Sequence, residues 1–249
     1  TTGTIFPFGD PHHGQPDAAT FTSIGEEQLT FTWSDSNGPA AFDTALDPSS
    51  PDSFQGIIPF IDFNGSDEEA DTPDIAYFSR DDSGSNPWSI GAWVNITASA
   101  AYQSILSKWL NSSNLNEWRF AVDTSEKLTL ALHDESAAVT IDRTSDDALT
   151  AGVWTHAVAT YDSAGGSSAA DTITLYVDGA VRDSAATNNG SYVAMENLTS
   201  VVMLGGHDGS AKFTSKMAGA SHGPWFTQIE LTADAVKRIF QVQRPALAL

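Results

Sequence analysis

Acidic side chains crowd the segment from residue 62 to residue 82, where eight carboxylates accompany a single base, Arg80. Crowded oxygen ligands in a loop suit Ca²⁺, which takes about six to eight of them. The spacing is not that of an EF-hand, and a solvated acidic loop is the alternative interpretation. We predict a calcium site, with four carboxylates as the first candidate ligands: Asp67, Glu69, Asp71 and Asp74.

The charge balance of the whole chain is strongly acidic. Eleven Lys and Arg residues accompany thirty-two Asp and Glu residues in 249 residues, so the formal net charge is −21. Phosphate binding needs clustered basic residues, so this balance argues against nucleic acid and against anionic lipid surfaces as partners. Self-repulsion of this size destabilises a compact chain unless salt or bound cations screen it, so a saline setting is expected.

A stretch from residue 152 to residue 182 predicts antiparallel strands. Residues 154–161 divide into two alternating faces with the two-residue period of a strand, and the run from Thr172 to Val177 places Ile173, Leu175 and Val177 on one face. Asp178-Gly179 then has the composition of a tight hairpin turn. Further short runs with turn signals between them predict an all-β, antiparallel jelly-roll β-sandwich; they span residues 28–33, 57–63, 88–94, 104–109, 118–122, 127–132, 138–141 and 201–204.

One helix is expected near the end of the chain. Thr232 is a good N-cap, and Asp234 lies in the first turn, where the helix dipole favours an acid. Leu231 before the cap can pack on Val236 as a hydrophobic staple. We expect a short helix that plugs one end of the sandwich and is followed by an apolar tail, residues 246–249.

Two segments are expected: residues 1–55 as an N-terminal extension or arm with one strand, and residues 56–249 as the jelly-roll domain. The first segment either plugs an edge of the domain or packs on a neighbouring subunit. There is no cysteine, which excludes disulfides and thiolate metal sites. No apolar run is long enough to span a membrane. The first residues do not resemble a signal peptide, so a signal was either removed or never present.

An ordered set of motifs resembles the laminin-G-like and pentraxin-like branch of the concanavalin A-like lectin/glucanase superfamily. The set lies between residues 57 and 242 and consists of Phe63-Asn64-Gly65, residues 88–94, Ile105-Leu106-Ser107-Lys108, residues 149–162, residues 173–179, Leu204-Gly205-Gly206 and the helix start at residues 231–234. The resemblance is specific for the fold. It is weak for function, because this fold carries lectins, adhesion modules, hydrolases and virion proteins.

The resemblance implies that Trp93 and Trp154 belong to the core and leaves other tryptophans as candidates for a carbohydrate site. An exposed aromatic ring stacks on the apolar face of a sugar, as lectins of this fold often show, although packing in the core is the alternative for each ring. The loop at residues 207–210 is similar to one that lines ligand sites in relatives. The candidate carbohydrate-binding residues are Trp109, Trp225, His207 and Asp208, with Trp118 a weaker one.

Catalysis is not expected. Hydrolases of this superfamily carry a Glu-x-Asp-x-x-Glu strand whose carboxylates act as nucleophile and general acid. The most similar segment, residues 69–74, ends in Asp and contains Pro73, which a central strand excludes. We predict no catalytic residues and no cofactor other than Ca²⁺.

Two hypotheses for the function follow. The first is a structural or adhesion protein on a virion or other surface, similar to laminin-G-like modules of tailed-phage particles. It predicts other subunits of the particle, further copies of this chain and glycans as partners. The second is a secreted calcium-dependent carbohydrate-binding module, which predicts exposed aromatic rings and a monomer. A glycoside hydrolase is a distant third. Under the first two, the location is a virion surface or the extracellular space.

Overall fold

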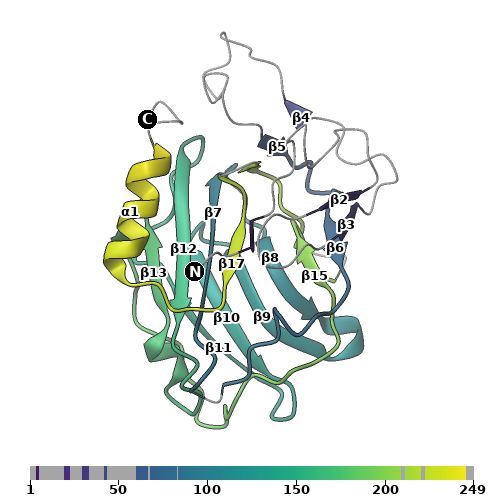
Figure 1. Cartoon of the computed structure of the whole chain (residues 1–249), viewed down its shortest axis with the longest axis vertical. Helices are drawn as coiled ribbons and strands as arrows, with labels where there is room; N and C mark the ends of the chain where they lie inside the picture. The colour runs from purple at the N-terminus through teal and green to yellow at the C-terminus, as the bar shows by residue number, and fades with distance from the viewer. Residues whose placement is uncertain are drawn as a thin grey trace.

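The protein folds into two antiparallel β-sheets packed face to face, with one α-helix on the outside (Figure 1). The structure, a computed structural model, describes residues 4–5, 20–22, 30–33, 42–43, 60–66, 68–82, 84–208, 211–219 and 222–244. The predicted all-β jelly-roll sandwich with a C-terminal helix is confirmed.

The first sheet, called sheet A, is built around the long strands β7 (Trp88–Asn95) and β12 (Trp154–Tyr161). Along its main path the remaining strands are β4 (Phe42–Asp43), β5 (Phe60–Asp62), β16 (Lys216–Ala218), β13 (Thr174–Val177) and β14 (Ala180–Val181). Strand β17 (Trp225–Thr227) also pairs with β7 and carries β1 (Thr4–Ile5) on its other side.

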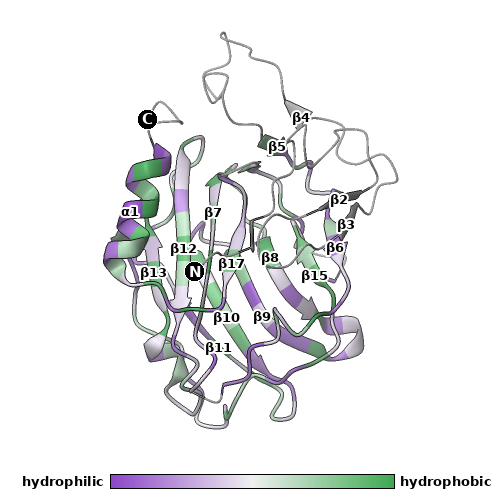
Figure 2. Ribbon diagram, viewed as in Figure 1, coloured by the Kyte–Doolittle hydropathy of each residue, from purple (hydrophilic) through white to green (hydrophobic). Residues whose placement is uncertain are grey.

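The second sheet, called sheet B, contains the other long strands. Its order is β11 (Val139–Thr144), β10 (Leu128–Asp134), β9 (Leu115–Val122), β8 (Gln103–Leu110), β15 (Val202–Leu204), β6 (Ala70–Thr72), β3 (Thr30–Trp33) and β2 (Thr20–Thr22). Two short 3₁₀ helices, η1 (Asn111–Ser113) and η2 (Ala169–Thr172), lie in the connections. Polar and apolar segments alternate along strands such as β9 (Figure 2).

Most strand bounds agree with the alternation in the sequence. The predicted hairpin is present, since β13 pairs with β14 across a turn in which Asp178 and Gly179 both have positive φ, 53° and 74°. These angles match the turn type whose twist fits two antiparallel strands. The hairpin was therefore encoded locally.

The core between the sheets is dominated by aromatic rings. Trp88 of sheet A and Trp118 of sheet B have ring centroids 5.7 Å apart, and both stack on Phe226 at 5.2 and 5.6 Å. The Trp118 indole nitrogen donates a hydrogen bond to the carbonyl of Phe78 at 3.0 Å. Trp118, a weaker candidate for sugar binding, is thus a core residue with no exposed surface.

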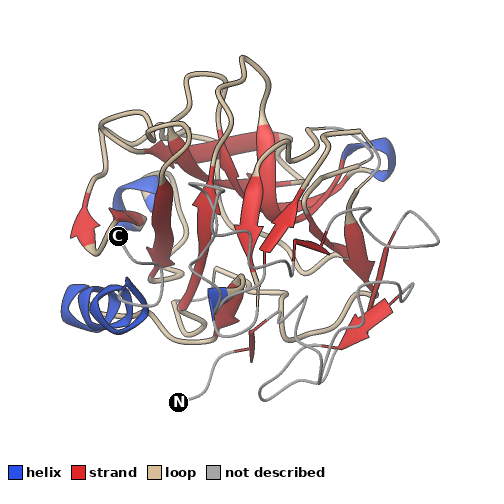
Figure 3. Cartoon of the chain, turned by 90° about the horizontal axis from the view of Figure 1, so that it is seen from above, coloured by secondary structure: helices blue, strands red, loops and turns tan. Residues whose placement is uncertain are grey.

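Helix α1 (Ala233–Gln243) lies along the outer face of sheet A, and does not plug an end of the sandwich as expected (Figure 3). The Thr232 hydroxyl caps it by accepting a hydrogen bond from the Ala235 amide at 3.3 Å. Its fully buried residue is Val236, and Leu231 packs on the same cluster, as the predicted staple requires. The apolar tail after residue 244 lies outside the described residues.

Those parts of the first 55 residues that the structure describes pair with the sandwich. Strands β2 and β3 extend sheet B next to β6, and β4 pairs with β5 at the edge of sheet A. Within the described ranges, no helix combines the length and apolar character that crossing a membrane requires.

Candidate functional site

The outer face of sheet B carries a row of side chains that the strand register sets side by side. Along β9, Trp118, Phe120 and Val122 point into the core, so Arg119 between them points outward. Its register neighbours are Ser107 on β8 and Ala131 on β10, and Ala131 in turn pairs with Asp142 on β11. Of the described helices, none packs on this face, because α1 lies on sheet A.

Arg119 is held by aromatic rings. Its guanidinium carbon lies 4.1 Å from the ring centroid of Tyr102 and 4.5 Å from that of Trp109. Both distances are within the range of a cation–π contact. Tyr102 and Arg119 are half-buried, whereas Trp109 is only 4% exposed. Trp109 therefore supports the arginine from below more than it offers a surface of its own.

His207 joins this cluster from the loop after β15. A nitrogen of Arg119 donates to its Nε2 at 3.4 Å, and its Nδ1 lies 2.8 Å from the Ser104 hydroxyl. Because an arginine nitrogen only donates, Nε2 accepts, and the ring proton is on Nδ1. Burial, together with the charge of Arg119, lowers the pKa of His207 to about 4. The imidazole is consequently neutral at physiological pH.

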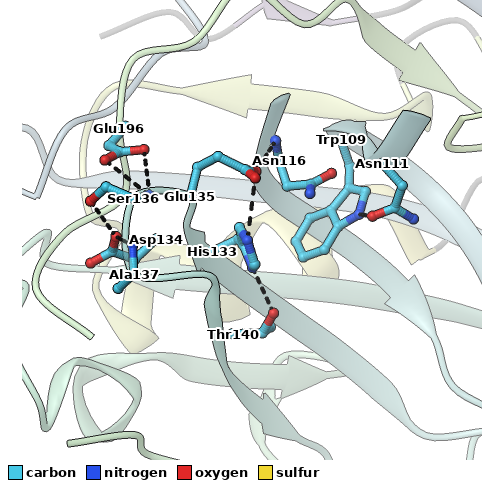
Figure 4. A network of polar contacts seen from close by, with 10 residues as sticks. All are labelled: Trp109, Asn111, Asn116, His133, Asp134, Glu135, Ser136, Ala137, Thr140 and Glu196. Atoms are coloured by element: carbon cyan, nitrogen blue, oxygen red, sulfur yellow. Dashed lines mark hydrogen bonds and ion pairs between the residues drawn. The ribbon is translucent and has the colours of Figure 1, made fainter. Parts of the chain in front are cut away.

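A second histidine, His133 on β10, lies beside Trp109, with ring centroids 5.3 Å apart (Figure 4). Its Nδ1 is 2.8 Å from the Thr140 hydroxyl, and its Nε2 is 3.6 Å from Oε2 of Glu135. Burial lowers the pKa of His133, although the nearby carboxylates oppose that shift. Glu135 also accepts a hydrogen bond from the Asn116 amide at 3.0 Å.

Loop contacts fix the edge of this cluster. Asp208, which has a positive φ of 49°, accepts hydrogen bonds from the amide and the hydroxyl of Ser112 at 2.8 and 2.7 Å. The Trp109 indole nitrogen donates to the Asn111 side chain at 2.9 Å. The loop after β15 is thereby joined to η1, which follows β8.

Three of the four predicted carbohydrate-binding residues lie in this region. Trp109 and His207 are in contact, with ring centroids 6.5 Å apart, and Asp208 anchors the adjacent loop. Trp225 does not join them: it lies on β17 in sheet A, is 8% exposed and packs with Val158 beneath α1. Neither Trp109 nor Trp225 forms the exposed stacking platform that we expected.

Sequence reasoning did not identify Arg119, Tyr102 or His133 as site residues. The signal for Arg119 was available, because a charged residue between Trp118 and Phe120 on an alternating strand must point away from the core. No local signal indicated that Tyr102 and Trp109 would enclose it. Asp142 adds a carboxylate at the end of the row; burial raises its pKa, although the Thr187 hydroxyl and the charge of Arg119 oppose the shift.

Of the four carboxylates predicted to bind calcium, the three that the structure describes have separate surroundings. Glu69 forms an ion pair with Lys212, and Asp74 lies 3.1 Å from Nζ of Lys108. Asp71 is in the middle of β6, where burial raises its pKa. Asp67 lies outside the described residues. Among the residues that are described, no three His, Asp or Glu side chains come together in a group suited to a metal ion.

Lys108 of sheet B is a buried cation that is surrounded by oxygen atoms. Its ammonium group is fully buried and contacts Asp74, Glu117 and the carbonyl of Leu198, the last at 2.6 Å. Burial raises the pKa of Glu117 to about 7, although Lys108 opposes the shift. Because Glu117 also accepts from the Leu198 amide at 2.9 Å, this cluster fastens a loop to the sheet.

Solved structures with the same fold are binding domains of clostridial toxins. The binding domain of botulinum neurotoxin serotype G has a TM-score of 0.62 at 12% identity, over 96% of this chain and 50% of that one. The binding domain of Paraclostridial Mosquitocidal Protein 1 has a TM-score of 0.61 at 11% identity, over 96% and 52%.

A structure of botulinum neurotoxin type C, whose cell entry is described as dependent upon interaction with two ganglioside molecules, has a TM-score of 0.60 at 10% identity, over 96% and 51%. The chain thus spans about half the length of these proteins, and at such identities the likeness establishes the fold. No curated protein matches the sequence.

A sequence model described as the concanavalin A-like lectin/glucanases superfamily matches residues 64–236, which is more than half of the chain. The match includes β6 to β17 and the first turn of α1. It therefore contains every residue of the Arg119 cluster, which consists of Tyr102, Trp109, Arg119, His133 and His207. The chain belongs to the laminin-G-type family of the concanavalin A-like lectin/glucanases superfamily.

Proposed function

We propose that this protein is a non-catalytic carbohydrate-binding module that binds its ligand on the outer face of sheet B. The observation that carries the proposal is the Arg119 cluster, a fixed set of polar and aromatic groups on the sheet face that α1 leaves free. The membership of the chain in a superfamily that includes lectins supports a sugar as the ligand of this face.

The chemistry of the face suits hydroxyl groups. Arg119 supplies donors and Asp142 supplies acceptors, while His133 and Thr140 supply both kinds. All four are partly exposed, and their neighbours hold them in place. Sugar sites combine a few well-placed polar groups with some apolar surface, which here is the half-buried ring of Tyr102. In this arrangement Trp109 positions Arg119 and His133 from beneath.

The toxin relatives support binding over assembly. Their structures are described as binding domains, one in connection with gangliosides and another in complex with a sialylated ligand. Since this chain spans about half of those proteins, a ganglioside or sialylated glycan is a candidate ligand only. We therefore prefer the binding-module hypothesis to the virion-assembly hypothesis. Calcium, subunit partners and an extracellular or virion-surface location stay predictions.

A non-catalytic role is consistent with the placement of the carboxylates. Glycoside hydrolysis needs two carboxyl groups on either side of the scissile bond. The segment at residues 69–74, the most similar to a hydrolase signature, instead uses Glu69 and Asp74 in ion pairs with lysines. The superfamily also contains glucanases, so absence of hydrolysis is part of the proposal.

The test is a glycan array followed by titration calorimetry with the glycans that bind. We expect a dissociation constant in the micromolar to millimolar range, and we expect Tyr102→Ala to weaken it at least tenfold. Val242→Ala, on the exposed side of α1 at 78% exposure, is the matched control and should bind like the original protein. Failure to bind any glycan, or equal binding by Tyr102→Ala, would contradict the proposal.

A further inference from the structure

Arg119 is a half-buried cation whose direct contacts are all neutral, and the carboxylate of Asp142 acts on it only from farther along the row. Tyr102 and Trp109 contact its guanidinium through their rings, and the third contact is Nε2 of His207 at 3.4 Å. Its register neighbours, Ser107 and Ala131, are also uncharged. Aromatic rings stabilise a cation through their quadrupole, but they do not neutralise it.

Three other shielded bases in the described chain have a carboxylate in direct contact, whereas the buried Arg80 donates to the carbonyl and side-chain oxygens of Asn86. Lys108 has Asp74 and Glu117, Arg143 has Asp183 at 3.1 Å, and Lys212 has Glu69. No carboxylate among the described residues lies within 4 Å of the Arg119 guanidinium, although the chain has 32 acids for 11 bases. Removal of a charge from water without an opposite charge is costly, so this site favours an anion.

The geometry also indicates which anion. A guanidinium presents its donors as a planar fork that matches the two oxygens of a carboxylate. Tyr102 and Trp109 hold the plane of Arg119, so little side-chain freedom is lost when the fork is occupied. A single arginine suits a single carboxylate, and Asp142 farther along the row can accept from neighbouring hydroxyls.

From this arrangement we propose that the ligand is a glycan bearing a carboxylate, as in a uronic acid, and that the carboxylate binds the terminal nitrogens of Arg119. The inference rests on the proposed function. The net charge of −21 disfavours densely charged polymers, such as sulfated chains, that approach over a large surface. The net charge does not prevent a single carboxylate from binding Arg119, because physiological salt screens exposed charges beyond about 8 Å.

The experiment compares carboxylated oligosaccharides with their carboxyl-reduced forms, in which each carboxylate has become a primary alcohol. We expect the original protein to prefer the acidic member of at least one pair by tenfold or more. Arg119→Gln should abolish the preference while it retains the weaker binding of the reduced form. Arg238→Gln, an exposed arginine on α1, is the matched control and should keep the preference.

The outcomes separate the two proposals. Equal binding of acidic and reduced forms would overturn the carboxylate assignment and leave carbohydrate binding intact. Stronger binding of sulfated than of carboxylated oligosaccharides would also overturn it. Binding of neither form would contradict the proposed function itself. The comparison of ligands uses the original protein, so it decides the matter even if Arg119→Gln does not fold.

Discussion

The outer faces of the two sheets use similar residues in opposite ways. On sheet A, Trp93 stacks on Phe240 of α1 at 5.8 Å between ring centroids, and its indole nitrogen donates to Gln243 at 2.8 Å. On sheet B, Trp109 supports Arg119 and His133, which are partly exposed. One face has been used to attach a helix, and the other presents polar groups.

Two buried histidines show the same difference between the outer faces of sheets A and B. His156 on sheet A packs against both Trp93 and Phe240, and neither ring nitrogen has a hydrogen-bond partner among the described residues. His207 on sheet B uses both nitrogens, toward Ser104 and Arg119. A ring used only as a packing element belongs to the scaffold. A ring with both nitrogens engaged helps to orient a cation, which is what a binding face needs.

The largest expected effect comes from the loss of a ring that attaches α1. Trp93→Ala removes the stack on Phe240 and the bond to Gln243, and loss of a buried tryptophan costs about 3–5 kcal/mol. Denaturant unfolding should show this decrease, whereas Tyr102→Ala, with its half-buried ring, should cost much less. Equal losses of stability would remove the distinction between the faces.

Acid should destabilise the protein through both faces. Burial lowers the pKa of His156 to about 3 and that of His207 to about 4, against about 6.5 in an unfolded chain. Below pH 6.5 the unfolded state takes up protons that these two histidines do not accept in the folded state, so their contribution to stability falls as the pH drops from 6.5 toward 4. Glu117, whose pKa burial raises to about 7, acts in the opposite direction in the same window.

The check is the unfolding free energy measured at several pH values in that window. His156→Phe should reduce the slope because one of the two groups is gone. Glycan binding should also weaken near pH 4, because a charged imidazole at His207 would face Arg119. An unchanged slope in the variant would show that His156 does not titrate in this way.

Replacing the two histidines at neutral pH should give effects of opposite sign. His156→Phe keeps a ring packed against Trp93 and Phe240 and removes two unpaired nitrogens, so we expect a gain of about 1 kcal/mol. His207→Phe leaves the Ser104 hydroxyl and Arg119 without their partner, so we expect a loss of about 1–3 kcal/mol. Thermal unfolding of the pair checks the prediction, and a change of the same sign in both would contradict it.

The smallest effect concerns the start of α1. Thr232→Ala removes the hydroxyl that accepts from the Ala235 amide, which should cost about 0.5–1 kcal/mol. Affinity at sheet B should be unchanged, because the helix contacts the other sheet. The matched control is Thr232→Ser, which keeps the cap. A change of glycan affinity in Thr232→Ala would indicate that the two faces are coupled.

Local patterns in the sequence predicted most of the fold, whereas the site depended on contacts between distant residues. The turn at Asp178-Gly179 and the cap at Thr232 require only their own neighbours, and both are present. The contact between Arg119 and His207 joins residues 88 positions apart through the order of β15, β8 and β9. Alternation indicates that a residue faces outward, but not which residues surround it.

The expectation for Trp225 shows the same limit. Its spacing gave no reason to place it in the core, yet α1 covers the face on which it lies. Gly91 on β7 makes room for it, because a Cβ there would lie 2.5 Å from the Trp225 ring. The sequence did not specify the face on which the helix packs, so it could not show that this tryptophan would be covered.

The most direct test of the account is to follow the tryptophan indole N–H signals by ¹H–¹⁵N NMR while a glycan from the array is added. The account predicts that the Trp109 signal shifts, because its ring contacts Arg119, whereas the signals of Trp93 and Trp225 beneath α1 stay in place. Shifts confined to Trp93 or Trp225, with Trp109 unmoved, would place the ligand on the opposite sheet and contradict the central claim.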